Sequence, residues 1–552
     1  MTAPASRSIE PTTEPDTSPA IEPAIDVLWL LGVGGLVVAI SLSLWSPFVL
    51  DCDVSNLALG IEHFDIHQHQ PHPPGYLGYV LLLRGLRAVT GSSLLDTTRL
   101  LSRMFAVATV GRVWGAARAY APSRRAVRVA ASLLAATNAV LLYYAVDGQT
   151  HSAEGAMAAG LVWALAPERA AALSWRRVAL IGVLLAAGGS LRPSFALLAV
   201  LPVLWVLWFD LGRLGLVALI GAVGTAAWFV PTVILSGGLH RYQETSDALI
   251  GAFIRITSVL SSEHNERALA LNLRNTLAWS LLALGLVGVS ALVARLRRAS
   301  VDDASRRAGL VLLAMALPAV SFYALVLCAE AGYLSGLVPP ACVYVALQLF
   351  PADGARRAGT VWTTALAAGQ LALFLFLPYG LGRTFMLPTV AEVVSRVTRT
   401  EIMWERVHAG VGAGEPVLVI SDFPDPTILR QFPILEDRFE VALFYTKRIF
   451  SLNKHGALTL ARAHSWRSAP GQALNVDGPE RELTTPTAYR WVVIDPRTSN
   501  FLRAELRAQL QPGCIIEDRD EAFSAPRLDA GCFAGTVIDF EGLALHFAAR
   551  GP

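Results

Sequence analysis

The sequence predicts an α-helical polytopic membrane protein, with about 11 transmembrane helices, followed by a C-terminal α/β extracytoplasmic domain. The first observation is composition: 54% of the 552 residues are hydrophobic and only 16% are charged, whereas a soluble domain has about 25% charged residues. The second is that about eleven apolar runs, each near the ~20 residues that a bilayer requires, precede residue 380. The third is that short β-branched runs replace these long apolar runs beyond that point.

The charge balance and the cysteines exclude some classes of partner. The net charge is only +2, so nothing predicts binding to nucleic acid. The five cysteines show no CxxC or other metal-ligand spacing. Cys514 and Cys532 would form one disulfide if the C-terminal part faces an oxidising compartment, and two free thiols otherwise.

The N-terminal region changes character near Val27. Residues 1–26 are rich in Pro, Thr, Ser, Glu and Ala and show no apolar period, which predicts a disordered cytoplasmic tail. The apolar run from Val27 to Leu50 is too long for the core of a signal peptide, and no convincing small-residue cleavage site accompanies it. We therefore expect a retained first membrane span.

The remaining spans are expected around ten further apolar centres. These are Val107, Leu134, Ala159, Leu184, Leu201, Val223, Leu284, Leu313, Tyr344 and Leu371. The runs around Leu184 and Leu201 are short, and Arg192-Pro193 separates them. We expect two short helices there that meet at Arg192, because proline interrupts a helix.

Clusters of arginine predict how the chain is oriented in the membrane. Cytoplasmic loops carry an excess of Lys and Arg, and the clusters all fall on one side if the N-terminus is cytoplasmic and the spans alternate. This holds only if residues 76–90 do not cross. That segment is short and carries Arg84 and Arg87, so we expect an interfacial amphipathic helix. Lys447 and Lys454 are the only lysines, and this bias towards Arg, with the abundance of Ala, suggests a GC-rich bacterial genome. The protein is therefore expected to be a multi-pass protein of the bacterial cytoplasmic (inner) membrane.

From about Gly380 the composition changes. The segments EPVLVISDFPDP and YRWVVIDP are short apolar runs closed by Asp and Pro, as in the buried strands of an α/β unit. Residues 381–552 are enough for one accessory domain, and an odd number of spans places it in the periplasm. We find no catalytic motif in this region.

The stretch from Asp51 to Tyr76, DCDVSNLALGIEHFDIHQHQPHPPGY, collects ionisable groups directly after the first apolar run. It holds four of the 11 histidines and begins with two acids, Asp51 and Asp53. A dense set of ionisable groups at the mouth of a membrane helix is a candidate functional site, although a polar connecting loop would explain any single residue. The outer loop of residues 51–97 is therefore where we expect the site.

The architecture and these segments resemble the GT-C superfamily. Its members are polytopic glycosyltransferases that use polyprenyl-phosphate sugars, among them protein O-mannosyltransferases and aminoarabinose transferases. DVSNLALGIEHFDIHQHQPHPPGY is similar to the acid–small-aliphatic–FD–QPHPPGY pattern of one bacterial branch. TTRLLS at 97–102, YYAVDGQTHSAEGA at 143–156 and AGYLSGLVPPA at 331–341 resemble its Arg-x-x-Ser, Tyr-x-x-acid and GY…P elements. The resemblance covers roughly residues 27–380.

The resemblance implies a function for that transmembrane domain. A sugar would pass from a polyprenyl-phosphate-linked donor to an acceptor on the outer face of the membrane. Two other classes stay open: a non-catalytic scaffold that binds lipid-linked sugar, and a transporter or flippase. A transporter would place acids or broken helices near mid-membrane in paired halves, whereas here the polar residues collect on one face. The sequence does not indicate which glycan, lipid or protein is the acceptor.

Glycosyl transfer with inversion requires a carboxylate that takes the proton of the acceptor. One base can suffice here, because the leaving group is already an anionic lipid phosphate. The motif spacing favours Asp53 as the base and leaves Asp51 as the alternative, and either acid could instead cap the helix that follows. Asp147 falls where the superfamily places a second carboxylate near the site. Glu154 is a further acid that could simply begin the fourth span.

A lipid phosphate also requires a cationic clamp, and arginine suits this role because its donors form a fixed fork. Arg99 and Arg103 are expected at the outer end of the second span, and Arg192 at an outer-face helix break. Snorkelling towards the headgroups is the alternative for Arg103. The other candidate substrate-binding residues are His72, Tyr76, Glu330 and Tyr333.

A divalent cation is a further candidate cofactor, since some GT-C enzymes depend on a metal. Asp65, His67 and His69 offer ligands for one in the same stretch. HxHxxH in a loop is a weak metal spacing, and hydrogen bonding at the membrane interface explains these histidines as well. The sequence therefore assigns no cofactor beyond this candidate cation.

Overall fold

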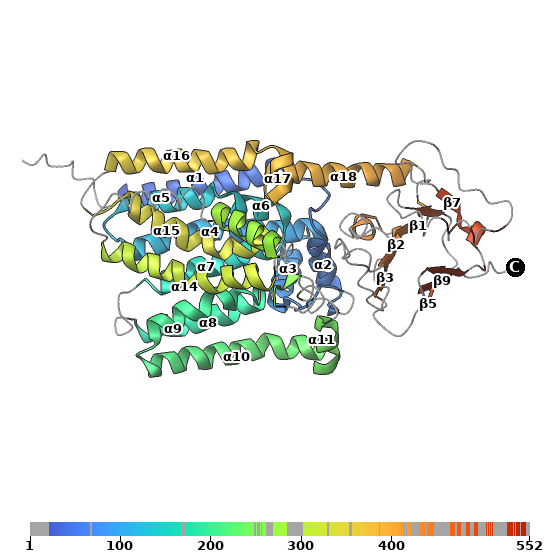
Figure 1. Ribbon diagram of the computed structural model, residues 1–552, viewed down its shortest axis with the longest axis horizontal. Helices are drawn as coiled ribbons and strands as arrows, with labels where there is room; N and C mark the ends of the chain where they lie inside the picture. Colours follow the sequence, from blue (N-terminus) through green and yellow to red (C-terminus); the bar gives the residue numbers. More distant parts are fainter. Residues whose placement is uncertain are drawn as a thin grey trace, which may run out of the picture.

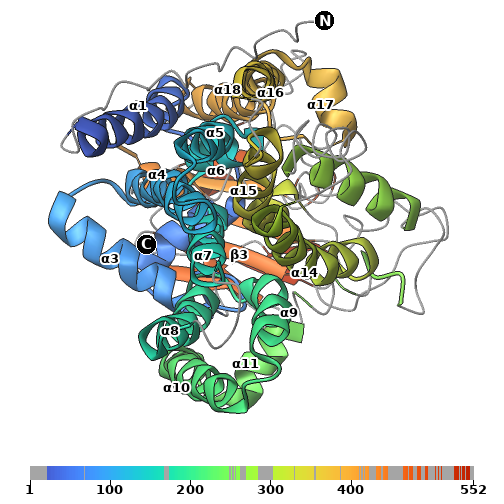
Figure 2. The ribbon, with the colours of Figure 1, turned by 90° about the vertical axis from the view of Figure 1, so that its left-hand side faces the viewer.

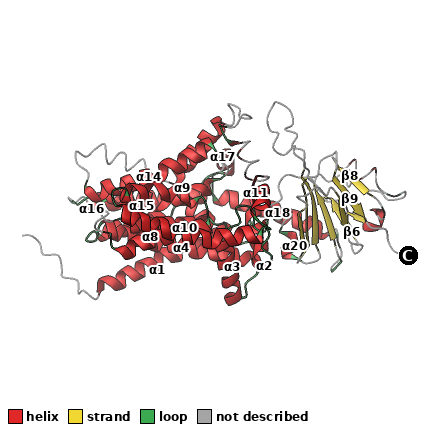
Figure 3. Cartoon of the chain, turned by 90° about the horizontal axis from the view of Figure 1, so that it is seen from below, coloured by secondary structure: helices red, strands yellow, loops and turns green. Residues whose placement is uncertain are grey.

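The computed structural model describes residues 21–547 with gaps. The segments outside the description are 67–68, 167–172, parts of 248–256, 261–268, 284–301, 328–329, 353–355, 386 and many short segments beyond 409, the longest being 446–463. Long helices form a bundle, and one further helix, α18, leads from the bundle to the strands of the C-terminal part (Figure 1). Strands are confined to that C-terminal part among the described residues (Figure 3).

Most of the described chain before residue 410 is helical. The helices are α1 (Ile21–Ser43), α2 (Cys52–Glu62), α3 (Leu77–Thr90), α4 (Leu94–Tyr120), α5 (Arg125–Ala136), α6 (Ala139–Asp147), α7 (His151–Ala164), α8 (Trp175–Leu191), α9 (Phe195–Leu207), α10 (Leu211–Leu235), α11 (Leu239–Ser246), α14 (Asp303–Leu325), the 3₁₀ helix η4 (Ala331–Leu337), α15 (Val338–Leu349), α16 (Arg356–Phe376), α17 (Tyr379–Phe385) and α18 (Val390–Ala409). Helix α4 packs against α1, α5, α6 and α7, and Figure 2 shows α4 and α7 near the middle of the bundle. Small buried residues such as Ala106, Ala117 and Ala156 allow close approach of these helices.

Helix α1 differs from its expected bounds at both ends. It begins at Ile21, so the last residues of the expected tail, 21–26, are helical. Pro23 lies in the first turn, where its missing N–H is not needed. The helix ends at Ser43 rather than near Leu50, because Pro47 disfavours helical conformation at the residue before it. Residues 1–20 lie outside the description.

Five described helices are long and apolar enough to cross a membrane, and the α5–α6 pair, bent by 51°, would make a sixth. The other expected centres lie in helices that are shorter or carry several arginines, or in 284–301, outside the description. The chain therefore has the character of a multi-pass membrane protein, and a total of about 11 spans stays a prediction. Helices α8 and α9 meet at Arg192, which confirms the expected break.

Helix α3 is the segment that we expected not to cross. Figure 2, which looks along the bundle, shows α3 lying across the direction of the long helices. Its Tyr79 and Leu83 are buried, whereas Leu81 and Leu82 are exposed. A separate helix is thus confirmed, and its amphipathic character and its placement at the membrane interface stay predictions.

The region after residue 409 contains the two predicted strands. EPVLVISDFPDP holds β1 (Val417–Ser421) and YRWVVIDP holds β6 (Trp491–Ile494), and these two strands pair in parallel. The other described elements are α20 (Phe432–Leu435), β2 (Phe439–Tyr445), β3 (His464–Ala469), β4 (Gln472–Asn475), β5 (Glu482–Thr485), β7 (Arg527–Asp529), the 3₁₀ helix η6 (Ala530–Phe533), β8 (Val537–Phe540) and β9 (Leu543–Phe547). One sheet has the order β4-β3-β2-β1-β6-β7, and a second has the order β5-β9-β8. The α/β class of the whole region stays a prediction, because much of it lies outside the description. Cys532 is disulfide-bonded, and its expected partner Cys514 is not among the described residues.

Candidate active site

The two acids at the start of α2 occupy different positions. Asp51 is the N-cap, and its carboxylate accepts a hydrogen bond from the backbone N–H of Asp53 at 2.9 Å. Asp53 lies in the first turn with its side chain 33% exposed, and its Oδ1 is 3.2 Å from Nδ1 of His72. The side-chain amide of Asn56 donates to the same oxygen at 3.3 Å. The capping role that we considered for both acids thus falls to Asp51.

The HPPGY segment folds back onto α2. Nε2 of His72 lies 3.2 Å from the hydroxyl of Tyr76, so the imidazole stands between Asp53 and Tyr76. Gly75 has φ +102°, and a Cβ added there would lie 2.8 Å from Cγ2 of Thr232. Only glycine fits this turn without strain. The turn therefore determines where His72 meets Asp53.

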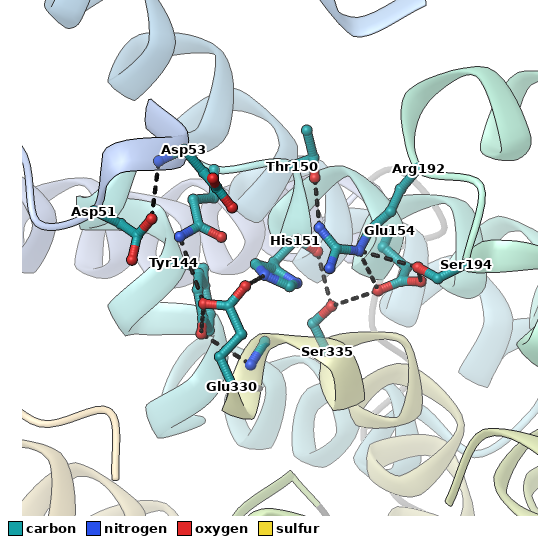
Figure 4. A network of polar contacts seen from close by, with 12 residues as sticks. Asp51, Asp53, Tyr144, Thr150, His151, Glu154, Arg192, Ser194, Glu330 and Ser335 are labelled. Atoms are coloured by element: carbon teal, nitrogen blue, oxygen red, sulfur yellow. Dashed lines mark hydrogen bonds and ion pairs between the residues drawn. The ribbon is translucent and has the colours of Figure 1, made fainter. Parts of the chain in front are cut away.

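A second polar network lies at the ends of helices far apart in the chain (Figure 4). The carboxylate of Glu330 is 2.7 Å from Nε2 of His151 and accepts from the hydroxyl of Tyr144 at 3.3 Å and from the amide of Gln149 at 3.5 Å. Burial alone would raise the pKa of Glu330, but His151 and Arg192 outweigh burial and lower that pKa below its usual range. Glu330 is thus an anion held by several donors.

Arg192 is 6% exposed and is held by three neighbours on α7 and at the start of α9. Its Nη1 donates to the hydroxyl of Thr150 at 2.7 Å, and its Nε is 3.1 Å from Oγ of Ser194 and 3.5 Å from a carboxylate oxygen of Glu154. The guanidinium lies over the ring of Tyr333, 5.0 Å from the centroid. A buried charge needs a partner, and Glu154 is that partner as well as an acid in the first turn of α7.

Two of the arginines of α4, Arg99 and Arg103, are engaged elsewhere. Arg99 is 3% exposed, donates to the carbonyl of Phe48 at 2.6 Å and lies 3.3 Å from Asp96. Arg103 donates to the carbonyl of Ser41 at 3.4 Å. Arg99 thus stabilises the chain between α1 and α2, and Arg103 contacts the last turn of α1. A contact of either arginine with a lipid phosphate stays a prediction.

Asp147 is the last residue of α6 and is 1% exposed. Neither of its carboxylate oxygens has a hydrogen-bond partner among the described residues. A buried carboxyl without a partner is costly unless a ligand, an ion or water serves it. The expected role of Asp147 as a second acid of the site stays a prediction.

Within the described part of the chain, one group of side chains is close enough to hold a metal ion. Asp51, Cys52 and Asp53 offer ligand atoms that lie within 4.8 Å of one another, and the two carboxylates suit a hard divalent cation. Asp65 and His69 do not belong to this group. His67 lies outside the description, so a site formed by Asp65, His67 and His69 stays a prediction.

The fold and the site define a polytopic helical protein whose acids and arginines gather at the ends of its helices. ArnT from Cupriavidus metallidurans, in a crystal structure bound to undecaprenyl phosphate, is similar over 92% of this chain and 98% of its own, with a TM-score of 0.56 and 12% sequence identity. Its apo structure matches with the same coverage, a TM-score of 0.54 and 13% identity. The resemblance expected from the sequence is thus confirmed for the fold, which this chain shares with ArnT.

The oligosaccharyltransferase AglB from Archaeoglobus fulgidus, in complex with an inhibitory peptide and a dolichol-phosphate, matches with a TM-score of 0.40 and 15% identity over 74% of this chain and 64% of its own. That likeness is too distant to support an inference about this chain. No protein-family model and no curated protein sequence matches the chain.

Sequence reasoning did not identify His151, Tyr144 and Arg396 as residues near the site. His151 begins an apolar helix within the YYAVDGQTHSAEGA segment, and an ionisable residue in such a place is a recognisable signal. Arg396 lies in α18 and carried no such signal, because arginines on an amphipathic helix are commonplace. Its contact with Asp51, at 3.6 Å, depends on tertiary structure.

Proposed function

We propose that this protein is a glycosyltransferase of the bacterial inner membrane that transfers a sugar from a polyprenyl-phosphate-linked donor to an acceptor on the outer face. One observation carries the proposal. In a chain with the fold of ArnT, Asp53 presents a partly exposed carboxylate in the first turn of α2, and His72 lies 3.2 Å from it. The matched ArnT structure contains undecaprenyl phosphate, which supports a lipid-phosphate donor here.

The transfer is an inverting displacement at the anomeric carbon of the sugar. Asp53 accepts the proton of the nucleophilic group of the acceptor, which attacks that carbon. The bond between the anomeric carbon and the phosphate oxygen breaks, and its electron pair leaves with the lipid phosphate. His72 orients the carboxylate of Asp53 through the contact at 3.2 Å. Asp147 is the second acid near the reacting centre.

Arg192 is the proposed ligand of the lipid phosphate. Thr150, Ser194 and Glu154 already hold its guanidinium in place, so the side chain loses little further freedom when an anion binds. Arginine also matches the geometry of phosphate oxygens better than lysine does. The stacked rings of Tyr323 and Tyr333, 4.8 Å apart, support the guanidinium from one side.

The proposed orientation places the N-terminus in the cytoplasm and the C-terminal part in the periplasm. The arginine clusters support it through the positive-inside rule. The disulfide at Cys532 is a second support, because disulfides persist in oxidising compartments such as the periplasm.

The test is a comparison of cell-envelope glycans by mass spectrometry. A deletion strain is complemented with the wild-type gene or with the Asp53→Asn variant, and the two proteins are matched in amount by immunoblot. We expect one glycan modification to disappear on deletion and to return with the wild type alone. An envelope that is unchanged by the deletion would count against the function. Restoration by Asp53→Asn would favour a scaffold that binds lipid-linked sugar without transferring it.

A further inference from the structure

Arg396 of α18 reaches the residues that directly precede α2. Its Nη1 donates to the carbonyl of Leu50 at 2.9 Å and lies 3.6 Å from the carboxylate of Asp51. Its Nε donates to Glu392, one helical turn earlier, at 2.7 Å, which orients the guanidinium. Because Asp51 caps α2, a charge on α18 is linked to the start of the helix that presents Asp53.

Two further side chains hold the residues just before Leu50. The backbone N–H of Val49 donates to Oε1 of Gln431 at 3.0 Å, and Gln431 is completely buried. The ring of Trp404 meets that of Phe48 edge-on at 6.1 Å between centroids. All four residues from Phe48 to Asp51 are thus contacted by side chains from beyond residue 390.

An apolar contact lies beside these polar ones. Ile434 and Leu435 of α20 pack against a buried cluster formed by Val49, Val54, Ala58 and Leu95. Two members of this cluster, Val54 and Ala58, lie in α2 itself. The C-terminal part therefore contacts both the segment before α2 and one face of α2.

The side chains that make these contacts are themselves fixed. The ring of Trp404 packs against Phe432 at 4.8 Å and Phe439 at 5.3 Å between centroids. Phe432 belongs to α20 and Phe439 begins β2, and both are completely buried. The helix α18 is thereby joined to the sheet, and a movement of the sheet would reach Phe48 and Asp51.

We propose that Arg396, Trp404 and Gln431, which we call the 48–51 clamp, position Asp53 for glycosyl transfer. None of the three needs to touch the substrate, so they are positioning residues. This role rests on the proposed function, because a loss of transfer can be measured only if the protein is a transferase. It assigns the C-terminal part a role in catalysis through α2, where the sequence indicated only an accessory domain.

The main variant is Arg396→Ala in the full-length protein. A displacement of about 1 Å at a catalytic group can cost on the order of 10²-fold in rate, so we expect the level of modification per molecule in the complemented deletion strain to fall by about that factor. Binding of undecaprenyl phosphate in nanodiscs should stay within about twofold of wild type, because Arg192, the proposed ligand of the phosphate, is held by Thr150, Ser194 and Glu154 and not by Arg396. Arg396→Lys keeps the charge that faces Asp51 and should recover part of the loss.

Arg399→Ala is the matched control. Arg399 lies one turn further along α18, is exposed, and contacts Ser395 and Tyr379 rather than the 48–51 segment. We expect it to behave as wild type in both measurements. A loss that is equal for Arg396→Ala and Arg399→Ala would indicate a general effect on α18 and would overturn the proposal.

Hydrogen exchange of the purified protein tests the clamp without any transfer reaction. Gln431→Leu and Arg396→Ala should raise exchange in peptides that cover residues 48–54, since the N–H of Val49 loses its acceptor or the segment loses its anchor. Unchanged hydrogen exchange in both variants would overturn the proposal. Faster exchange in a variant that still transfers sugar at the wild-type level would also overturn it. If the wild type restores no modification, the proposed transferase function fails, and the exchange data alone then decide whether the clamp exists.

Discussion

Replacing Asp53 by asparagine separates catalysis from folding. The substitution keeps the size of the side chain but removes the group that accepts a proton. A lost general base costs roughly 10²–10⁴-fold in rate, which corresponds to about 3–5 kcal/mol of transition-state stabilisation. The folding cost is smaller, because the side chain of Asp53 is 33% exposed and a carboxylate at such a position in the first turn of a helix contributes about 0.3–1 kcal/mol.

Asp51→Asn is the matched control for this prediction. Asparagine is as good an N-cap as aspartate, and Arg396 would still donate to the carbonyl of Leu50. We therefore expect at most a few-fold loss of transfer. The assay is sugar transfer by each purified variant in nanodiscs, with lipid-linked donors extracted from the parent membranes, beside a thermal-shift measurement of folding.

The outcomes of this pair distinguish three mechanisms. Loss of transfer in Asp53→Asn with unchanged thermal stability supports Asp53 as the base. An inactive Asp51→Asn beside an active Asp53→Asn would move the base by two residues to Asp51. If both variants transfer sugar as the wild type does, no acid of this pair is the base and the assignment at the start of α2 is refuted.

Three further predictions concern the membrane topology, Arg192 and the turn at Gly75. After Gly380, a fused reporter enzyme that works only in the periplasm should be active, and after Arg298, one that works only in the cytoplasm should be active. The reverse result at either position would refute the orientation. Arg192→Lys keeps the charge beside Glu154 but loses the fork of donors, so binding of undecaprenyl phosphate should weaken about tenfold while the protein still inserts into the membrane. Wild-type affinity of this variant would show that Arg192 does not bind the phosphate. Gly75→Ala should lower the midpoint of thermal unfolding, because a side chain at φ +102° with a contact of 2.8 Å costs roughly 1–3 kcal/mol, and an unchanged midpoint would contradict the turn geometry.

The sequence by itself determined the features that depend on local pattern. Apolar runs of membrane length predicted the helical class, and Arg192-Pro193 predicted the break between α8 and α9. The β-branched runs predicted β1 and β6, which the structure places side by side. These features are readable because helix and strand formation depend on residues that are neighbours along the chain. The bounds of α1 were less accurate, since the ends of an element depend on single residues such as Pro23 and Pro47.

Only the tertiary structure decided how the charged side chains pair. Asp51 and Asp53 are two residues apart and look alike in sequence, and the fold makes one the N-cap and turns the other towards His72. Glu330 meets His151 across 179 positions, and Arg396 meets Leu50 across 346. No local pattern predicts such contacts, because they form only when helices from distant parts of the chain pack together and bring their ends to the same place.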